Sequence, residues 1–285
     1  MEKNYLRYSK LLTAIVSILI VLGIFFLVRD RGGNMLKIHF IDVGCGDAIL
    51  FELPDGKFML IDSGSKQYAE HVRQYLTQRN ITEIDTAILT HPHYDHFEGF
   101  DVLVDHFPIN NFYTNGDERN PHEGYFEVIG KIKAKGIEPV VIREGMELYP
   151  DDKNVFIKIL HPQKIEGSTN ENAIVTWLVY GKTSFLFMSD IQVKQQERII
   201  ELFPEIQAAD CIQVPHHGGR VSDSFVALSK DRILIVSTGK NYRGEEKPIA
   251  AEISKLQGNL LYRTDKMGDI TLVSNGRKVS LIHGK

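Results

Sequence analysis

The sequence predicts an α/β domain in which two sheets are covered by helices, preceded by one membrane-spanning helix. Three observations support this prediction. An uncharged apolar run occupies residues 11–28. Short runs rich in aliphatic and aromatic residues recur through the rest of the chain, as in strands, and helix-like stretches separate them. Tight hairpins join several of these runs, which is typical of a layered fold.

The composition is that of a globular protein. The chain has 285 residues, of which 43% are apolar and 25% charged. Its formal net charge of −4 gives no overall attraction to a nucleic-acid backbone, although the composition does not exclude a local basic groove. The two cysteines, Cys45 and Cys211, lie in no CxxC pattern, and we expect them to be buried free thiols.

The apolar run at 11–28 is long enough to cross a membrane. At about 1.5 Å per residue it covers roughly 27 Å, close to the thickness of the hydrocarbon core. Basic residues before it favour a cytoplasmic N-terminus, and no small-residue cleavage site follows it. We therefore expect residues 1–34 to form an uncleaved anchor with a short linker. Residues 35–285 would then form a single domain outside the cytoplasm.

The domain begins with strand-like runs at 35–42, 48–53 and 57–62, and Pro54–Gly56 forms the turn between the second and third. A helical pattern at 66–79 precedes a buried strand at 84–90. Further helices are expected near 121–135, 191–203 and 246–257. Further strands are expected at 154–160, 210–214, 232–237 and 268–274, together with a hairpin turning at Gly181 and Lys182.

The stretch "THPHYDHFEG", residues 90–99, has the spacing of a metal-binding loop. Neutral imidazole and carboxylate are good ligands for zinc and for harder divalent ions. His91 and His93 fall on one side of an extended segment, and a turn can bring Asp95 and His96 to a second position. Four ligands suit two cations that share a bridging water. The alternative is a histidine-rich surface loop, but the preceding strand and Gly99 favour the metal loop.

Other candidate ligands stand at the ends of apolar strands. Asp62 ends "FMLID", Asp190 ends "SFLFMSD", and His216 and His217 end "CIQVPHHGG". Asp190 could bridge two cations and His216 could complete the shell of the second. Asp62 would hold a ligand histidine in place from behind. Each residue alone is more often a turn-former, so the prediction depends on the ordered set.

These motifs, taken in order, resemble the metallo-β-lactamase fold superfamily. The matching stretches are "IDVGCGDA", "LIDSG", "THPHYDH", "NENAIV", "FMSD", "PHHGG" and "YRTDKMGDITL". The resemblance implies an αββα sandwich with a dinuclear site at one edge. The first and last two of these stretches are similar to those of the hydrolase domain of the competence protein ComEC. They are also similar to those of the esterases that remove choline phosphate from teichoic acids.

The resemblance also implies a role for each position of the site. The first metal would be bound by His91 and His93, the second by Asp95, His96 and His216, and Asp190 would bridge both. His217 would face the substrate as a proton or hydrogen-bond donor, and Asp95 and Asn172 complete the expected catalytic set. Asn172 stands where many members have a third histidine for the first metal.

The chain departs from the family pattern at three positions. ComEC-type domains usually have aspartate where this chain has His93, and glycine where it has Ser189. Lys247 replaces a histidine before Pro248. A lysine there could pair with a phosphate as a point charge, and the alternative is a solvated loop lysine. His122 lies outside every motif, and we expect it to be a surface or packing residue.

The predicted function is a membrane-anchored phosphodiesterase or nuclease-like enzyme. Two divalent cations, zinc first with manganese or iron as alternatives, would share a hydroxide that attacks phosphorus. The substrate would be a phosphoester such as nucleic acid or a cell-wall polymer, with no obligate protein partner. The alternatives are a hydrolase of a carboxylic ester, lactone, thioester or lactam, and a non-catalytic accessory domain for DNA uptake.

Overall fold

The computed structural model describes residues 35–149, 155–241, 243–256 and 260–283. The apolar run at 11–28, expected to be a membrane anchor, lies outside these residues. Among the helices that the structure does describe, none combines the length and apolarity needed to cross a bilayer.

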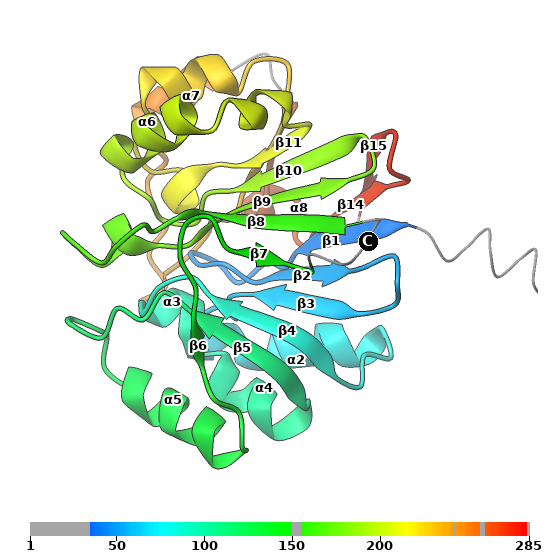
Figure 1. The fold of residues 1–285 in the computed structure, drawn as a ribbon, viewed down its shortest axis with the longest axis vertical. Helices are drawn as coiled ribbons and strands as arrows, with labels where there is room; N and C mark the ends of the chain where they lie inside the picture. Colours follow the sequence, from blue (N-terminus) through cyan, green and yellow to red (C-terminus); the bar gives the residue numbers. More distant parts are fainter. Residues whose placement is uncertain (1–34, 150–154, 242, 257–259, 284–285) are drawn as a thin grey trace, which may run out of the picture.

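Two sheets face each other and helices cover their outer faces (Figure 1), so the predicted α/β architecture with two sheets is confirmed. Sheet A has eight strands in the order β15-β14-β1-β2-β3-β4-β5-β6, and sheet B has seven in the order β13-β12-β11-β10-β9-β8-β7. The strands of sheet A are β1 (Leu36–Phe40), β2 (Ile49–Glu52), β3 (Phe58–Ile61), β4 (Ile84–Leu89), β5 (Ile109–Thr114), β6 (Val140–Val141), β14 (Ile270–Ser274) and β15 (Val279–His283). The strands of sheet B are β7 (Glu147–Leu148), β8 (Val155–His161), β9 (Val175–Tyr180), β10 (Thr183–Phe187), β11 (Cys211–Gln213), β12 (Ile233–Val236) and β13 (Leu260–Arg263).

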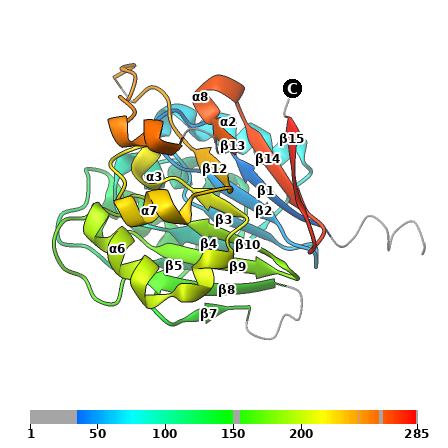
Figure 2. The same cartoon turned by 90° about the horizontal axis from the view of Figure 1, so that it is seen from above.

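Each outer face has its own helices. Sheet A is covered by α2 (Ala69–Gln78), α4 (Phe100–His106) and α5 (Tyr125–Ala134). Sheet B is covered by α6 (Val193–Leu202) and α7 (Asp223–Leu228), which lie on the near side when the sandwich is seen from above (Figure 2). Two short helices, α3 (Tyr94–Phe97) and α8 (Thr264–Met267), follow β4 and β13.

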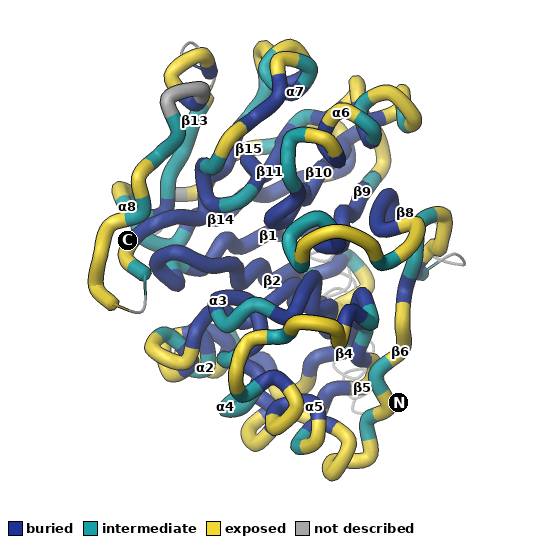
Figure 3. The backbone as a smooth tube through the Cα atoms, turned by 90° about the vertical axis from the view of Figure 1, so that its left-hand side faces the viewer, coloured by how far each residue is buried: buried dark blue, intermediate teal, exposed yellow. Residues whose placement is uncertain are grey.

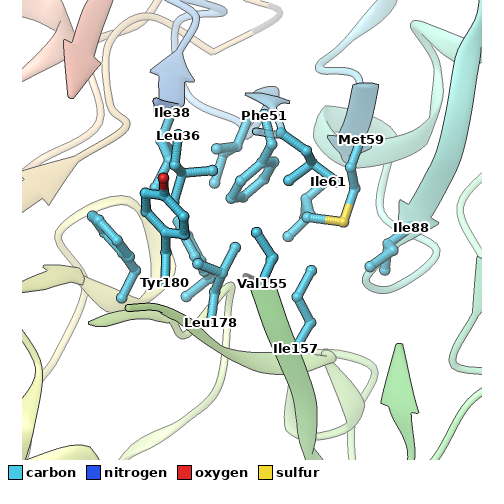
Figure 4. Close-up of a cluster of buried hydrophobic side chains, with 14 of the residues drawn as sticks. Leu36, Ile38, Phe51, Met59, Ile61, Ile88, Val155, Ile157, Leu178 and Tyr180 are labelled. Carbon is cyan, nitrogen blue, oxygen red and sulfur yellow. The ribbon is translucent and has the colours of Figure 1, made fainter. Parts of the chain in front are cut away.

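The main core lies between the two sheets, where aliphatic and aromatic side chains from both inner faces interdigitate (Figure 4). The rings of Phe51 on β2 and Phe187 on β10 meet edge to face, with their centroids 5.1 Å apart. Two further apolar clusters lie between each sheet and its helices. The strands are accordingly buried along most of their length, and the exposed backbone lies in outer loops and outer helix faces (Figure 3).

The parallel strands determine where a site can form. In sheet A, β3, β4 and β5 run parallel, and in sheet B β10, β11, β12 and β13 run parallel. Chains emerging from neighbouring parallel strands leave at the same edge of the sheet, where ligands commonly bind. The segments after β3, β4, β10 and β11 contain the strand-end carboxylates and histidines seen in the sequence.

Two elements differ from the sequence-based expectations. The helix expected near 246–257 is only a short 3₁₀ helix, Ala251–Leu256, because Pro248 lies in an irregular loop before it. Strand β5 was not expected, because its sequence "INNFYT" places two exposed asparagines in the middle and so breaks the apolar pattern.

Candidate metal centre

The carboxylate of Asp62, just after β3, organises the loop that follows β4. It is completely buried and accepts hydrogen bonds from the backbone N–H of Thr90 (2.8 Å), the hydroxyl of Thr90 (2.7 Å) and Nδ1 of His96 (2.7 Å). Because Nδ1 of His96 donates to a carboxylate, Nε2 is the ring nitrogen that points away from Asp62 and could bind a cation once it has lost its proton.

The hydroxyl of Thr90 sets the tautomer of His91. Its single proton goes to Asp62, so it can only accept from Nδ1 of His91, 3.0 Å away. The same oxygen accepts from the hydroxyl of Ser189 at 2.9 Å, which joins the loop after β4 to the loop after β10. His91 therefore has its proton on Nδ1, and its unprotonated Nε2 lies 3.0 Å from Nδ1 of His93.

His217 is oriented in the same way. Its Nδ1 lies 3.1 Å from the carbonyl oxygen of Ser237, which can only accept, so this nitrogen is the donor. Its Nε2 lies 3.2 Å from Oδ1 of Asp190 and 3.5 Å from Oδ2 of Asp95. Three imidazoles are thus held from behind with Nε2 directed into one centre.

Asp190 lies between two groups of ligand atoms. Its Oδ1 is 3.6 Å from Nε2 of His96 and 3.2 Å from Nε2 of His217, whereas its Oδ2 is 3.8 Å from Nε2 of His91. We call His91, His93 and Asp190 the first group. Ligand atoms of His96, Asp190 and His217 also lie within 4.8 Å of one another, together with Asp47, and Asp95 lies beside His217. We call His96, Asp190 and His217, with Asp95, the second group.

The second group contains polar atoms that the described protein leaves unsatisfied. Among the described residues, Nε2 of His96, Nε2 of His217 and Oδ1 of Asp190 are buried without a hydrogen-bond partner. Unsatisfied buried polar atoms are costly and therefore rare. One divalent cation would satisfy all three, and imidazole with carboxylate suits zinc, manganese or iron. The cluster is therefore suited to binding divalent metal ions.

The electrostatics of the centre favour a positive charge there. Burial disfavours a charged His96, but the carboxylates of Asp190 and Asp62 outweigh it and raise the pKa of His96 well above 6.5. Asp190 likewise outweighs the effect of burial on His217 and raises its pKa. Burial would raise the pKa of Asp190, but His217 and His96 hold it well below its ordinary value. Burial lowers the pKa of His91, so this imidazole is neutral.

The two adjacent histidines after β11 take different places from those expected. Both have positive φ, 53° at His216 and 55° at His217, and this left-handed turn directs their side chains to different sides. His217, not His216, lies with Asp95 and His96. The side chain of His216 is 30% exposed, with Nε2 3.6 Å from Oδ2 of Asp190, and it faces the open side of the centre.

Asn172 is not brought to either ligand group. Its buried amide donates to Asp117 (2.7 Å) and to the carbonyl oxygen of Ser168 (2.9 Å), and it accepts from the N–H of Glu166 (2.9 Å). The polar atoms of its side chain are all used, by Asp117 in the segment after β5 and by its own loop, which leaves none for a cation. The neighbouring Asn170 faces the site instead.

Two residues of the "DVGCGDA" loop reach the centre without having been expected there. The N–H of Asp47 donates to the carbonyl oxygen of Asp95 at 3.2 Å, and its buried Oδ1 lies 4.0 Å from Nδ1 of His217. Cys45 has its sulfur within 4.8 Å of ligand atoms of Asp95 and His217. Burial raises the pKa of the Cys45 thiol to about 12. A glycine-rich turn alone gives no signal for a ligand.

A cavity of about 380 Å³ opens onto the centre. It is lined by Cys45, His93, Tyr94, Asp95, His122, Asn170, Asp190, His216, Asn241, Glu245, Glu246, Lys247 and Pro248. His122 is exposed as expected, but its ring also stacks on His93 with centroids 4.5 Å apart. Lys247 is the only lysine or arginine among the described residues of this lining.

Comparison with known sequences identifies relatives in Bacillus subtilis and in Haemophilus influenzae. The chain is 24% identical to ComE operon protein 3 of Bacillus subtilis over 82% of this chain and 32% of that protein. It is 26% identical to Recombination protein 2 of Haemophilus influenzae over 72% of this chain and 24% of that protein. The chain thus spans a third or less of the length of these relatives. Both matches confirm the predicted ComEC-like relationship.

Solved structures share the fold. The metallo-beta-lactamase fold protein YhfI from Bacillus subtilis superposes with a TM-score of 0.52 at 14% identity, covering 80% of this chain and 96% of YhfI. A diphosphatase from the PhnP family superposes with a TM-score of 0.50 at 13% identity, covering 87% of this chain and all of that one (100%). The family model described as "Metallo-beta-lactamase superfamily" matches residues 41–236. With its two-sheet fold and its cluster of histidines and aspartates at the strand ends, the chain belongs to the metallo-beta-lactamase superfamily.

Proposed function

We propose that this protein is a metal-dependent hydrolase of phosphoester bonds that uses two divalent cations, with zinc as the first candidate. One observation carries the proposal. The two oxygens of Asp190 face different sets of buried imidazole nitrogens, 3.2–3.6 Å away on one side and 3.8 Å on the other. A carboxylate in this position would bridge two cations.

In this proposal the first group, His91, His93 and Asp190, holds one cation, and the second group, Asp95, His96, Asp190 and His217, holds the other. When bound, two cations would make a water acidic near neutral pH and neutralise negative charge on the reacting group. Asp62, Thr90 and the carbonyl oxygen of Ser237 each hold an Nδ1 atom, so that Nε2 of each of the three buried histidines is aimed at the centre and is the nitrogen that would bind a cation.

His216 takes the substrate-facing role in place of His217. It lines the cavity beside Oδ2 of Asp190, and the amides of Asn170 and Gln192 lie 3.3 Å from its two ring nitrogens. Burial lowers the pKa of His216, so the imidazole is neutral near pH 7. A neutral ring has one N–H, and an amide nitrogen can donate only to the other, unprotonated ring nitrogen. That bond fixes the plane of the ring and leaves its N–H to donate to a phosphoryl oxygen.

Lys247 is the cationic group among the described residues of a cavity lining that also contains the carboxylates of Asp95, Asp190, Glu245 and Glu246. Lys247 lines the cavity and supports a phosphodiester over a neutral ester. Two proteins to which the chain is similar, a diphosphatase and Recombination protein 2, support a phosphate-containing substrate. In this proposal the substrate is a nucleic acid or a cell-wall polymer. Residues 11–28 would anchor the enzyme in the cell membrane, with the catalytic domain outside the cytoplasm and no obligate protein partner.

A substrate panel tests the function against its alternatives. We expect turnover of bis-p-nitrophenyl phosphate, single-stranded DNA or a choline-phosphate ester by the metal-loaded protein. Turnover confined to a carboxylic ester, lactone, thioester or lactam would place it in another bond class. Stoichiometric metal without turnover of any ester would support a non-catalytic role in DNA uptake.

Three alanine variants separate the ligands from the substrate-facing residue. Asp95→Ala and His217→Ala should each lose one bound metal, and activity on bis-p-nitrophenyl phosphate should fall by roughly 10³-fold, since a bound cation supplies several kcal/mol. His216→Ala should keep both metals and lose activity. Metal analysis with steady-state kinetics checks this, and circular dichroism confirms folding. Full activity in Asp95→Ala would overturn the proposed site.

Metal affinity should depend on pH in a defined direction. Protons on His96 and His217 must leave before Nε2 can bind a cation, and both pKa values lie above 6.5. Affinity should therefore fall as pH decreases, starting above pH 6.5, by about tenfold per pH unit for each proton displaced. Competition titrations with a chromophoric chelator measure this. An affinity that is constant down to pH 6.5 would contradict the electrostatic account.

Lys247→Met should lower kcat/KM for bis-p-nitrophenyl phosphate by roughly tenfold, because a hydrogen bond to a charged group is worth about 1.5–3 kcal/mol and solvent weakens it at this half-buried position. The neutral ester p-nitrophenyl acetate should be turned over as before. Lys240→Met, whose exposed side chain is outside the cavity lining, serves as the control. Equal losses on both substrates would show that Lys247 is not a phosphate contact.

A further inference from the structure

The backbone around Cys45 is held in place by contacts on both sides. Its N–H donates to the carbonyl oxygen of Lys240 at 2.9 Å, while the N–H of Gly44 donates to Asp42 at 3.1 Å. Gly44 has a φ of +66°, and a Cβ atom there would collide with the same Lys240 carbonyl. On the other side, Gly46 packs directly against the backbone of Asp95. The contact between Gly46 and Asp95 therefore joins the loop that contains Cys45 to the histidine-rich loop that follows β4.

The side chain of Cys45 reaches the cavity at the second group. The residue is only 6% exposed, yet it lines the cavity together with Asp95 and Asp190. Its sulfur and ligand atoms of Asp95 and His217 all lie within 4.8 Å of one another. Nε2 of His217, a residue 2% exposed, is directed into this space without a hydrogen-bond partner among the described residues.

These three donors match the ligand chemistry of one metal in particular. Thiolate, imidazole and carboxylate are all zinc ligands, and a soft thiolate favours zinc over manganese. We infer that the sulfur of Cys45 is a further ligand of the cation in the second group and makes this position selective for zinc. When the bond between sulfur and cation forms, the S–H bond breaks and the proton passes to water. The inference rests on the proposed binding of a cation by the second group.

Cobalt substitution of the full-length protein tests the inference without relying on activity. A thiolate ligand gives cobalt(II) an intense near-ultraviolet charge-transfer band, which histidine and carboxylate do not produce. The wild type should show this band, and so should Cys211→Ala, because Cys211 is buried in the core between the sheets. Cys45→Ala should bind cobalt without the band. Loss of a residue that only supports a metal ligand typically lowers metal affinity by roughly 10–100-fold, so the zinc affinity of Cys45→Ala should fall by at least that factor. The preference of this variant for zinc over manganese should also be smaller.

A second measurement avoids any variant of Cys45. Zinc-edge X-ray absorption of the zinc-loaded Cys211→Ala protein should show one sulfur neighbour at about 2.3 Å. Bound metal with no sulfur neighbour, or a charge-transfer band that persists in Cys45→Ala, would overturn the inference while leaving the proposed function intact. Failure of the wild type to bind zinc or cobalt at all would overturn both.

Discussion

The hydroxyl of Thr90 is the point at which the two sheets are joined at the metal centre. It donates to Asp62 after β3 and accepts from His91 after β4 and from Ser189 after β10. All of its hydrogen-bonding capacity is used, so the loop after β4 cannot rotate away from the loop after β10 without breaking buried bonds. The tautomer of His91 and the position of Asp190, one residue beyond Ser189, both depend on this contact.

The sequence indicated which segments would meet. The strands that lead into Asp62, the 91–96 loop and Asp190 each have a parallel neighbour, and parallel neighbours open at one edge, so the convergence of these three segments was predictable. The helices α2, α5 and α6 and most strands also agree with the apolar periodicity to within a few residues. Helices and strands are local structures, so the spacing of apolar side chains along the sequence indicates them directly.

Some site residues lie elsewhere than the sequence predicted, because their positions depend on backbone conformations and loop contacts that the periodicity of apolar residues does not indicate. His216 and His217 are adjacent, and only their left-handed φ values decide which one turns inward. Such conformations cost about 1–3 kcal/mol each and persist where the surrounding structure imposes them. The amide of Asn172 is bound by Asp117 and by its own loop, whereas Cys45 reaches the centre through a glycine turn. A single sequence indicates neither outcome.

The origin of the ligand atoms in both sheets has a consequence for how the protein matures. Asp95 and His96 belong to the first half of the chain, while Asp190 and His217 belong to the second, and neither half holds a complete second group. A cation could therefore bind only after the two halves of the chain have packed together, and its bonds to both halves would then stabilise their packing. A shortage of the metal ion would therefore lower the stability of the packing between the two sheets as well as the activity.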